Sequence, residues 1–184
     1  EKFRKVNNFI SSKKKLTIVF TGRLHRHKNP EIIIKATKEL HNIKLIIIGD
    51  GEQKGYLEKV VREHNLPVKF LGQIKHNDLK KIYSKSDIFV LPSNYEGNPK
   101  SLLEAMASKL PVVASKVRGI EEIIKHNHNG LLFEKNNLGD LIKKLKKLKS
   151  KTIRKKIGDK GFEYVKKNSS LESYINKLIK IIKH

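Results

Sequence analysis

The chain has 184 residues, of which 38% are hydrophobic and 32% charged, and it contains no cysteine. This is about the length of one ordinary domain, and the composition excludes a mainly disordered chain. No apolar run reaches the roughly 20 residues of a membrane-spanning helix, the start does not resemble a secretory signal, and disulfides and thiolate metal sites are excluded. The sequence therefore predicts a globular protein of a reducing compartment such as the cytoplasm.

The net charge of +23 is the strongest anomaly of the composition, and residues 138–184 alone contain 15 Lys or Arg and 4 Asp or Glu. One interpretation is an ordinary amphipathic surface helix with a solvated lysine face. The other is attraction to an anionic partner, either lipid headgroups at the inner membrane face or nucleic acid. No stacking motif or zinc-finger spacing accompanies the basic residues, so no specific nucleic-acid partner is expected.

Residues 1–15 are polar, lysine-rich and aperiodic, as in an interdomain linker or arm. After them, short apolar runs rich in β-branched residues predict buried strands, at 16–21, 44–49, 68–72, 88–92, 111–115 and 130–134. Helical patterns fill the gaps, at 30–41, 52–65, 77–84, 100–109 and 118–126. This alternation predicts an α/β fold with a doubly wound, Rossmann-like parallel sheet, whose ligands bind at the carboxyl ends of the strands.

Three more helical stretches follow the last strand, at 138–149, 151–167 and 170–183. In the first of them, five apolar residues share one helical face, and lysines occupy the other. The five are Leu138, Leu141, Ile142, Leu145 and Leu148.

The first predicted strand runs into "TGRLHRHKNP", where Gly22 permits a close backbone approach and Arg23 and Lys28 precede a helix start. Two cations beside the positive end of a helix dipole suit a phosphate group. The segment is neither a P-loop nor a dinucleotide fingerprint, because Gly-Lys-Ser/Thr and G-x-G-x-x-G are both missing. In so basic a chain, two cations in one loop also have a purely structural interpretation.

Two later strand ends also carry glycine. In "GDGEQKG", Gly49 and Gly51 allow positive φ angles, and Asp50 or Glu52 is expected to cap the next helix. "FLGQI" is similar, and its backbone either contacts a nucleobase or simply turns. Neither segment alone distinguishes a ligand cradle from a strand-to-helix turn.

The most informative segment is "NYEGNPKSLLEAMASKLPVVAS", residues 94–115. Glu96 follows a buried strand, Pro99 suits a helix start, and Glu104 lies near the beginning of that helix. Carboxylates at the binding edge of the sheet suit sugar hydroxyls, whereas amides and cations suit a diphosphate. For Glu104 the structural alternative is a simple interaction with the helix dipole.

Seven segments, in order, resemble the nucleotide-sugar-binding C-terminal domain of the retaining family-4 (group 1) glycosyltransferases, which have the two-domain GT-B fold. They are "TGRL" with Lys28, "IIIGDGE", "VKFLG", "LKKIYSKSDIFVLPS", "EGNPKSLLEAMA", "LPVVAS" and "NGLLF". The resemblance extends over nearly the whole chain. It implies a linker at 1–15, a donor-binding domain at 16–169 and a helix at 170–184 that crosses back to an N-terminal acceptor domain.

The resemblance also implies roles for individual residues. Arg23 and Lys28 would hold the donor diphosphate and stabilise its growing charge, and Glu96 would accept from donor-sugar hydroxyls, so these three are the candidate catalytic residues. Glu104 would accept from the ribose hydroxyls. The expected donor contacts also include Gly22, Gly49, Gly72, Gln73, Ile74, Gly97, Asn98, Pro99, Lys100, Ser101, Leu102 and Leu103. The donor would be a UDP-, GDP- or ADP-sugar, with no cofactor, no metal and no protein nucleophile or base assigned.

Two departures from the family pattern concern details. Gly97, Asn98 and Pro99 replace a frequent Gly-Phe-Gly, which affects the fine contacts to the sugar, and Lys109 replaces a common Gly and is expected to change only a helix end. Glu122 matches a frequent Glu of the family, but it is expected to have a structural role, either capping or helix pairing. The His pairs 25/27 and 126/128 are expected at the surface. An isolated donor domain should bind nucleotide and transfer little sugar. The alternatives are another GT-B enzyme, such as an epimerase or a phosphorylase-like enzyme, or a basic nucleic-acid-binding module.

Overall fold

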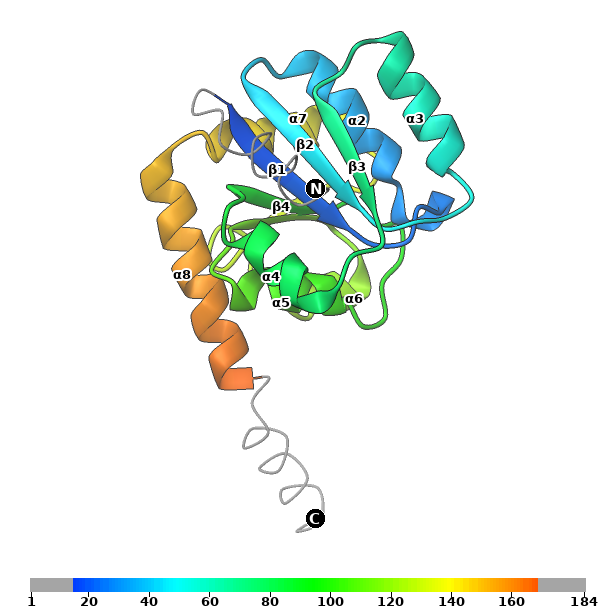
Figure 1. Cartoon of the computed structure of the whole chain (residues 1–184). Helices are drawn as coiled ribbons and strands as arrows, with labels where there is room; N and C mark the ends of the chain where they lie inside the picture. The colour runs from blue at the N-terminus through cyan, green and yellow to red at the C-terminus, as the bar shows by residue number, and fades with distance from the viewer. Residues whose placement is uncertain (1–14, 169–184) are drawn as a thin grey trace.

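The computed structural model describes residues 15–168, which fold around a six-stranded sheet (Figure 1). Its strands are β1 (Leu16–Thr21), β2 (Ile43–Ile48), β3 (Val68–Gly72), β4 (Ile88–Leu91), β5 (Val112–Ser115) and β6 (Leu131–Phe133). The order is β3-β2-β1-β4-β5-β6, with all neighbours parallel. The predicted Rossmann-like fold is therefore confirmed. Most of the predicted linker and the predicted helix 170–183 lie outside the described residues.

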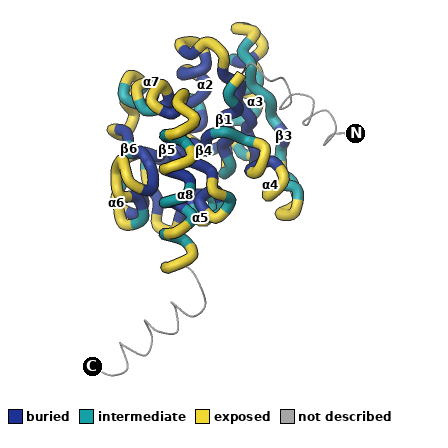
Figure 2. Tube along the Cα trace, turned by 90° about the vertical axis from the view of Figure 1, so that its left-hand side faces the viewer, coloured by how far each residue is buried: buried dark blue, intermediate teal, exposed yellow. Residues whose placement is uncertain are grey.

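Helices cover both faces of the sheet (Figure 1). On one face are α2 (Pro30–Glu39), α3 (Lys54–Glu63) and α7 (Leu138–Lys147), and on the other are α4 (His76–Tyr83), α5 (Lys100–Ala107) and α6 (Arg118–Glu121). The final described helix, α8 (Lys151–Asn168), packs against α5 and β5. Because the sheet is covered on both faces, its strands form the buried centre of the molecule, except for the edge strand β3, which is mostly half-buried (Figure 2).

The residues of β2 are all buried, and they include one lysine, Lys44, which is 2% exposed. Burial lowers the pKa of Lys44 because the low-dielectric interior disfavours its charged form. The other five residues of the strand are isoleucines and one leucine. Each fully buried side chain of this kind contributes about 1.5–3 kcal/mol of transfer free energy.

The predicted helix at 118–126 is too long, because α6 ends at Glu121. The buried Asn129 side chain accepts a hydrogen bond from the Lys125 amide at 2.7 Å and donates one to the Ile123 carbonyl at 3.0 Å. Asn127 adopts a left-handed conformation with φ of 63°. These contacts replace helical hydrogen bonds with a turn that leads into β6, so the apolar periodicity overestimates the helix.

The amphipathic pattern at 138–149 is confirmed as α7. Leu141, Leu145 and Leu148 are buried, and Leu138 and Ile142 are partly buried against the same core. The helix begins after Asn137, whose side chain accepts a hydrogen bond from the Asp140 amide at 2.9 Å. Its lysines therefore occupy the face that is turned away from the sheet.

Lys109 does more than change a helix end, so that expectation was incomplete. It lies just after α5 in a left-handed conformation with φ of 58°. Its ammonium nitrogen is 4.9 Å from the centre of the Phe162 ring of α8. A Cβ on Gly158 of α8 would lie only 2.2 Å from the Lys109 carbonyl oxygen, so α8 packs directly on this turn.

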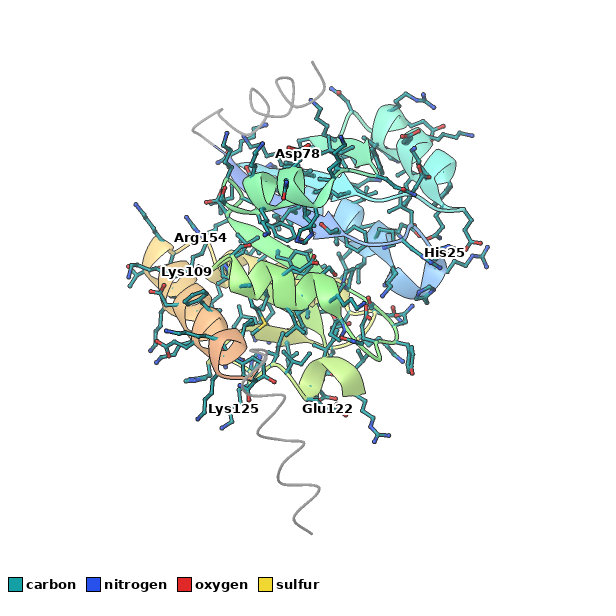
Figure 3. All side chains as sticks on the ribbon, turned by 60° about the horizontal axis from the view of Figure 1, so that its bottom comes forward. His25, Asp78, Lys109, Glu122, Lys125 and Arg154 are labelled. Atoms are coloured by element: carbon teal, nitrogen blue, oxygen red, sulfur yellow. The ribbon has the colours of Figure 1, made fainter. Side chains whose placement is uncertain are left out.

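Arg154 joins three parts of the fold at the side of the molecule opposite His25 (Figure 3). Its guanidinium donates to the carbonyls of Leu148 and Lys149 at 2.8 and 2.9 Å, and it lies 3.5 Å from the Asp87 carboxylate. Asp87 in turn accepts a hydrogen bond from the Thr17 amide at 2.9 Å. Arg154 thus ties the end of α7 and the start of α8 to the beginnings of β1 and β4.

We expect Arg154→Ala to lower the free energy of unfolding by about 3 kcal/mol, because hydrogen bonds to a charged group contribute about 1.5–3 kcal/mol. Urea denaturation would measure the loss. Lys155→Ala is the matched control, since that side chain is 80% exposed and, within residues 15–168, pairs only with Asp159. A loss for Arg154→Ala no larger than that of the control would contradict this account of the contact.

Candidate functional site

The loops after β1 and β4 meet at the carboxyl ends of these neighbouring strands. From this point the chain winds outward to β3 on one side and to β6 on the other, so β1 and β4 flank the topological switch point of the sheet. The Asn94 amide donates to the His27 carbonyl at 2.7 Å, and the Asn94 side-chain amide donates to the Arg26 carbonyl at 3.4 Å. These contacts hold the basic loop against the loop that carries Glu96.

Lys28 and Glu96 form an ion pair between the two loops. The ammonium of Lys28, in the short 3-10 helix η1 (Arg26–Lys28), lies 2.5 Å from Glu96 Oε1. The Ser93 hydroxyl donates to the same oxygen at 2.6 Å. Glu96 is 6% exposed. Within residues 15–168 no hydrogen bond is made by Glu96 Oε2, so this oxygen can accept from a ligand.

The backbone around Glu96 packs tightly against the end of β5 and against α6. The Ser115 hydroxyl donates to the Ser93 carbonyl, and both serines are buried. A Cβ on Gly119 of α6 would lie 2.1 Å from the Glu96 carbonyl oxygen. Residues from the ends of β4 and β5 and from α6 therefore fix the position of this acid.

Glycines bring the loops after β1, β2 and β3 into contact. The Gly22 amide donates to the Ile48 carbonyl at 3.0 Å, and the Gly49 amide donates to the Gly72 carbonyl at 2.9 Å. Gly49, with φ of 133°, lies so close to Gly22 that a Cβ would be 1.9 Å from the Gly22 carbonyl oxygen. Three of the predicted donor contacts thus form a single layer at the strand ends.

The expected capping of α3 by Asp50 or Glu52 is wrong. The helix begins after Gln53 without a side-chain cap. Asp50 instead accepts from the Lys54 ammonium and from the Gly51 amide, each at 2.9 Å, and these contacts lower the pKa of Asp50. Glu52 Oε1 lies 3.4 Å from His25 Nδ1. Both acids therefore help to shape the loops after β1 and β2 without capping the helix.

Arg23 is exposed and makes no ion pair with any described residue. It follows Gly22 directly, so its Cα lies at the same sheet edge as Lys28, but its guanidinium does not join the Lys28–Glu96 pair. The structure thus assembles two of the three candidate catalytic residues. Arg23 remains a candidate on the grounds of its position alone.

The amides at the start of α5 are less available than predicted. Those of Lys100, Leu102 and Leu103 donate to the carbonyls of Asn98 or Pro99 at 2.9–3.3 Å. Pro99 has no N–H and is buried, whereas Gly97 and Asn98 are exposed and Ser101 is half-buried. The loop backbone at Gly97 and Asn98 is therefore the more accessible part of the predicted amide set.

Glu104 lies on the other side of α5, facing α4. Its Oε1 is 3.9 Å from Nδ1 of His76, the first residue of α4. The loop leading to His76 contains Gln73, which is exposed, and Ile74, which is half-buried. The structure thus places the segment 72–74, which is predicted to line the base, next to Glu104, which is predicted to bind the ribose hydroxyls. No described contact joins Glu104 to Glu96.

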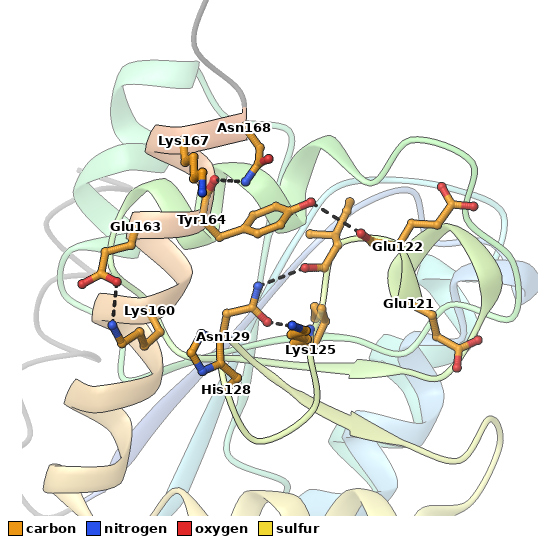
Figure 4. A pocket seen from close by; sticks show the side chains of 12 residues that line it. Glu121, Glu122, Lys125, His128, Asn129, Lys160, Glu163, Tyr164, Lys167 and Asn168 are labelled. Carbon is orange, nitrogen blue, oxygen red and sulfur yellow. Dashed lines mark hydrogen bonds and ion pairs between the residues drawn. The ribbon is translucent and has the colours of Figure 1, made fainter. Parts of the chain in front are cut away.

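Two hollows lie away from the ion pair. One, of about 530 Å³, is bounded by the segment 121–129 and the last turns of α8, where the Tyr164 hydroxyl donates to the Glu122 carbonyl at 3.5 Å (Figure 4). The other, of about 790 Å³, lies beside η1 and includes Arg26 and Tyr56. Glu122 Oε1 lies 3.6 Å from Nε of Arg118, four residues earlier, in agreement with the expected ion pair within the helix. Neither hollow contains a predicted donor contact.

Among the described residues, no three His, Asp or Glu side chains are grouped so that they could hold a metal ion. Four polar residues near the site were missed by sequence reasoning, namely Ser93, Ser115, His76 and Tyr83. Ser93 immediately precedes the Glu96 loop and Ser115 ends a predicted strand, so their positions at strand ends were an available signal. Tyr83 lies in the predicted helix 77–84 and His76 directly before it, and neither position carried a signal of a ligand site.

A sequence model described as "Glycosyl transferases group 1" matches residues 1–164. The UDP-Gal:alpha-D-GlcNAc-diphosphoundecaprenol alpha-1,3-galactosyltransferase of Escherichia coli is 33% identical over an alignment that covers 90% of this chain and 47% of that protein. Since other curated relatives show similar fractions, the chain spans less than half the length of those it matches.

Solved structures of related proteins have the same fold. The C-terminal domain of the group 1 family protein LpcC from Francisella tularensis has a TM-score of 0.77 at 28% identity, covering 89% of this chain and 92% of that one. S. aureus TarM, solved with fondaparinux, alpha-GlcNAc-glycerol and UDP, has a TM-score of 0.83 at 27% identity, covering 93% and 36%. The fold, the strand-end site and the family match together show that the chain belongs to the group 1 glycosyltransferases.

Proposed function

We propose that this chain is the donor-binding part of a retaining, hexosyl-transferring group 1 glycosyltransferase, which passes a sugar from a nucleotide diphosphate to a glycan or lipid-linked acceptor. The observation that carries the proposal is the Lys28–Glu96 pair at the switch point of the sheet. A cation and a carboxylate there suit the two ends of a sugar diphosphate. The UDP bound by TarM supports a donor of this class.

In this proposal Lys28 and Arg23 hold the diphosphate. Negative charge grows on the leaving diphosphate as the glycosidic bond breaks, so cations fixed beside it stabilise the transition state more than the ground state. Glu96 accepts from donor-sugar hydroxyls through Oε2, because Oε1 already receives Lys28 and Ser93. Glu104 accepts from the ribose hydroxyls. Neither a metal nor a protein base is part of this proposal.

Another domain of the parent protein is proposed to hold the acceptor. The chain spans less than half the length of its curated relatives, which supports a larger enzyme. The diphosphoundecaprenol in the name of the E. coli relative supports a lipid-linked acceptor and a role in polysaccharide assembly. Alone, the chain is expected to bind donor and to transfer little sugar.

The basic face of α7 is proposed to meet anionic headgroups at a cytoplasmic membrane surface. Lys144 is paired with Asp140 at 3.2 Å and Lys147 with the Asn127 side chain at 2.9 Å, whereas Lys143 and Lys146 are exposed without an ion pair to a described residue. No described helix is long and apolar enough to cross a bilayer. Vesicles with phosphatidylglycerol should therefore retain the chain, and Lys143→Glu with Lys146→Glu should weaken retention. Equal retention by phosphatidylcholine vesicles would exclude this role.

Calorimetric titration with UDP, GDP and ADP tests the donor site. We expect saturable binding of one nucleotide that falls about tenfold or more in Arg23→Ala, Lys28→Ala and Glu104→Ala, as loss of a charged hydrogen-bond partner predicts. His64→Ala, at an exposed position after α3, is the control. Binding that instead follows polynucleotide length and falls steeply with salt would favour the nucleic-acid-binding alternative.

A further inference from the structure

Two hydrogen-bond donors meet at one oxygen of Glu96, and they differ in how freely they can move. The Lys28 side chain, from the loop after β1, is 21% exposed. Ser93, two residues after the end of β4, is 0% exposed. An ammonium on a flexible four-carbon chain can turn toward a ligand, whereas a buried hydroxyl on a single carbon stays where the backbone places it. Ser93 is therefore the more permanent partner of the acid.

The backbone of Ser93 is itself held in place. The hydroxyl of Ser115, at the end of β5, donates to the Ser93 carbonyl, and Ser115 is also 0% exposed. The amide of the next residue, Asn94, donates to the His27 carbonyl at 2.7 Å. The Ser93 hydroxyl thus contacts Glu96 Oε1, at 2.6 Å, from a position that is fixed by β5 and by the basic loop.

The second oxygen of Glu96 is left for a ligand, because both donors contact Oε1. Oε2 makes no hydrogen bond to a residue of the range 15–168. It is nevertheless not one of the fully buried polar atoms that lack a partner, so solvent reaches it. An ionised carboxylate only accepts hydrogen bonds, and a sugar hydroxyl can donate one to it. The hydrogen bond at Oε1 therefore determines where Oε2 offers its lone pairs.

The proposed function gives Lys28 a second partner. In the structure its ammonium lies 2.5 Å from Glu96, whereas in the proposed complex it contacts the donor diphosphate. An ammonium that turns toward a phosphate moves away from the acid. Among the described residues, the Ser93 hydroxyl is then the one donor that still restricts the rotamers of the Glu96 side chain.

We propose that Ser93 is a positioning residue that keeps Glu96 directed at the sugar of a bound donor while Lys28 contacts the diphosphate. The inference rests on the proposed function and adds to it a residue that does not itself contact the donor. A carboxylate that is already held in its binding rotamer accepts from a sugar hydroxyl without a further loss of conformational entropy. Removal of the Ser93 hydroxyl should therefore weaken recognition of the sugar and not of the nucleotide.

The test compares nucleoside diphosphates with their sugar nucleotides by calorimetry of the 184-residue chain. The probes are UDP, GDP and ADP, together with UDP-glucose, UDP-galactose, UDP-N-acetylglucosamine, GDP-mannose and ADP-glucose. The affinity ratio is the Kd of the diphosphate divided by the Kd of the sugar nucleotide. For the pair that binds, we expect a ratio of about ten, which corresponds to one charged hydrogen bond. Ser93→Ala should lower the ratio to about three or less and change the diphosphate Kd by less than about twofold.

Further variants separate positioning from a general structural effect. Ser93→Cys has nearly the volume of serine but a weak donor, so its affinity ratio should resemble that of Ser93→Ala. Glu96→Gln should bring the ratio close to one, and adding Ser93→Ala to it should change nothing further, because both substitutions act through one contact. Ser86→Ala is the matched control, since its partly buried hydroxyl donates to the Ile82 carbonyl at 2.8 Å near the opposite end of β4.

The possible failures of the two proposals differ. Absence of saturable binding by every diphosphate and sugar nucleotide overturns the proposed function. Binding of a diphosphate with an affinity ratio near one in the parent chain preserves the nucleotide site but overturns the inference, since Ser93 would have no sugar contact to support. An affinity ratio that is unchanged in Ser93→Ala and Ser93→Cys overturns the role of Ser93 alone. An equal loss of affinity for diphosphate and sugar nucleotide does the same, because it would indicate a general structural effect.

Discussion

Lys28→Ala is expected to reduce nucleotide-diphosphate affinity by about 10- to 100-fold and the free energy of unfolding by about 3 kcal/mol, because removal of one partner leaves a buried charge unpaired. The carboxylate left behind is Glu96, which is 6% exposed and, among the residues that the structure describes, retains only the hydrogen bond from the Ser93 hydroxyl to Oε1. The estimate lies at the low end for buried pairs, since the Lys28 side chain is itself 21% exposed. Calorimetry and urea denaturation measure the two effects.

A double variant separates stability from binding. In Lys28→Ala with Glu96→Gln, the neutral amide no longer needs a cation, so much of the lost stability should return while nucleotide affinity stays low. Lys38→Ala, at an exposed position of α2, is the control and should change neither quantity. Recovery of affinity in the double variant would refute a direct contact between Lys28 and the diphosphate.

Gly49→Ala is expected to destabilise the fold by more than about 4 kcal/mol, the range reserved for severe backbone or packing conflicts. The position has φ of 133°, and the added Cβ would lie 1.9 Å from the Gly22 carbonyl oxygen. The clash is with backbone, so no side chain can move away to relieve it. Because Gly22 starts the loop that carries Arg23 and Lys28, any folded fraction should also bind nucleotide less well.

Gly55→Ala provides the matched comparison. It is the second residue of α3, and an added Cβ meets no heavy atom within 4 Å. Alanine is favoured over glycine in a helix by about 1 kcal/mol, so this variant should be more stable than the parent chain. Urea denaturation should show a lower free energy of unfolding for Gly49→Ala and a higher one for Gly55→Ala than for the parent chain. A Gly49→Ala protein as stable as Gly55→Ala would contradict the close approach of Gly49 to the Gly22 carbonyl.

The fold could be read from the sequence because its strands are continuous apolar runs covered on both faces. β2 illustrates this, since only Lys44 interrupts a run of isoleucines and leucine. Element ends were harder to place. Asn129 ends the region around α6 with side-chain hydrogen bonds to the backbone four and six residues before it, and apolar periodicity carries no information about such contacts.

The candidate site was predicted in part. Lys28 and Glu96 were chosen separately, and the structure brings them together across 68 positions of the sequence. The support from Ser93, Ser115 and Gly119 was missed, because it depends on how β4, β5 and α6 pack. The role of each residue toward a ligand stays a prediction, and the expectation that α5 offers a full row of amides must be narrowed to the loop before it.

If the proposed function holds, the contact between Lys28 and Glu96 makes recognition of the diphosphate and of the sugar interdependent. If the ammonium turns toward a phosphate, the acid beneath it loses its neutralising neighbour unless sugar hydroxyls take that place. A complete sugar nucleotide can bind the Lys28 ammonium and the Glu96 carboxylate at once. A nucleotide without its sugar can bind only the ammonium and leaves the carboxylate with neither the ammonium nor a sugar hydroxyl. Under the proposed function, this part of the parent protein would thereby favour intact donor over spent product, which would bias it toward product release after transfer.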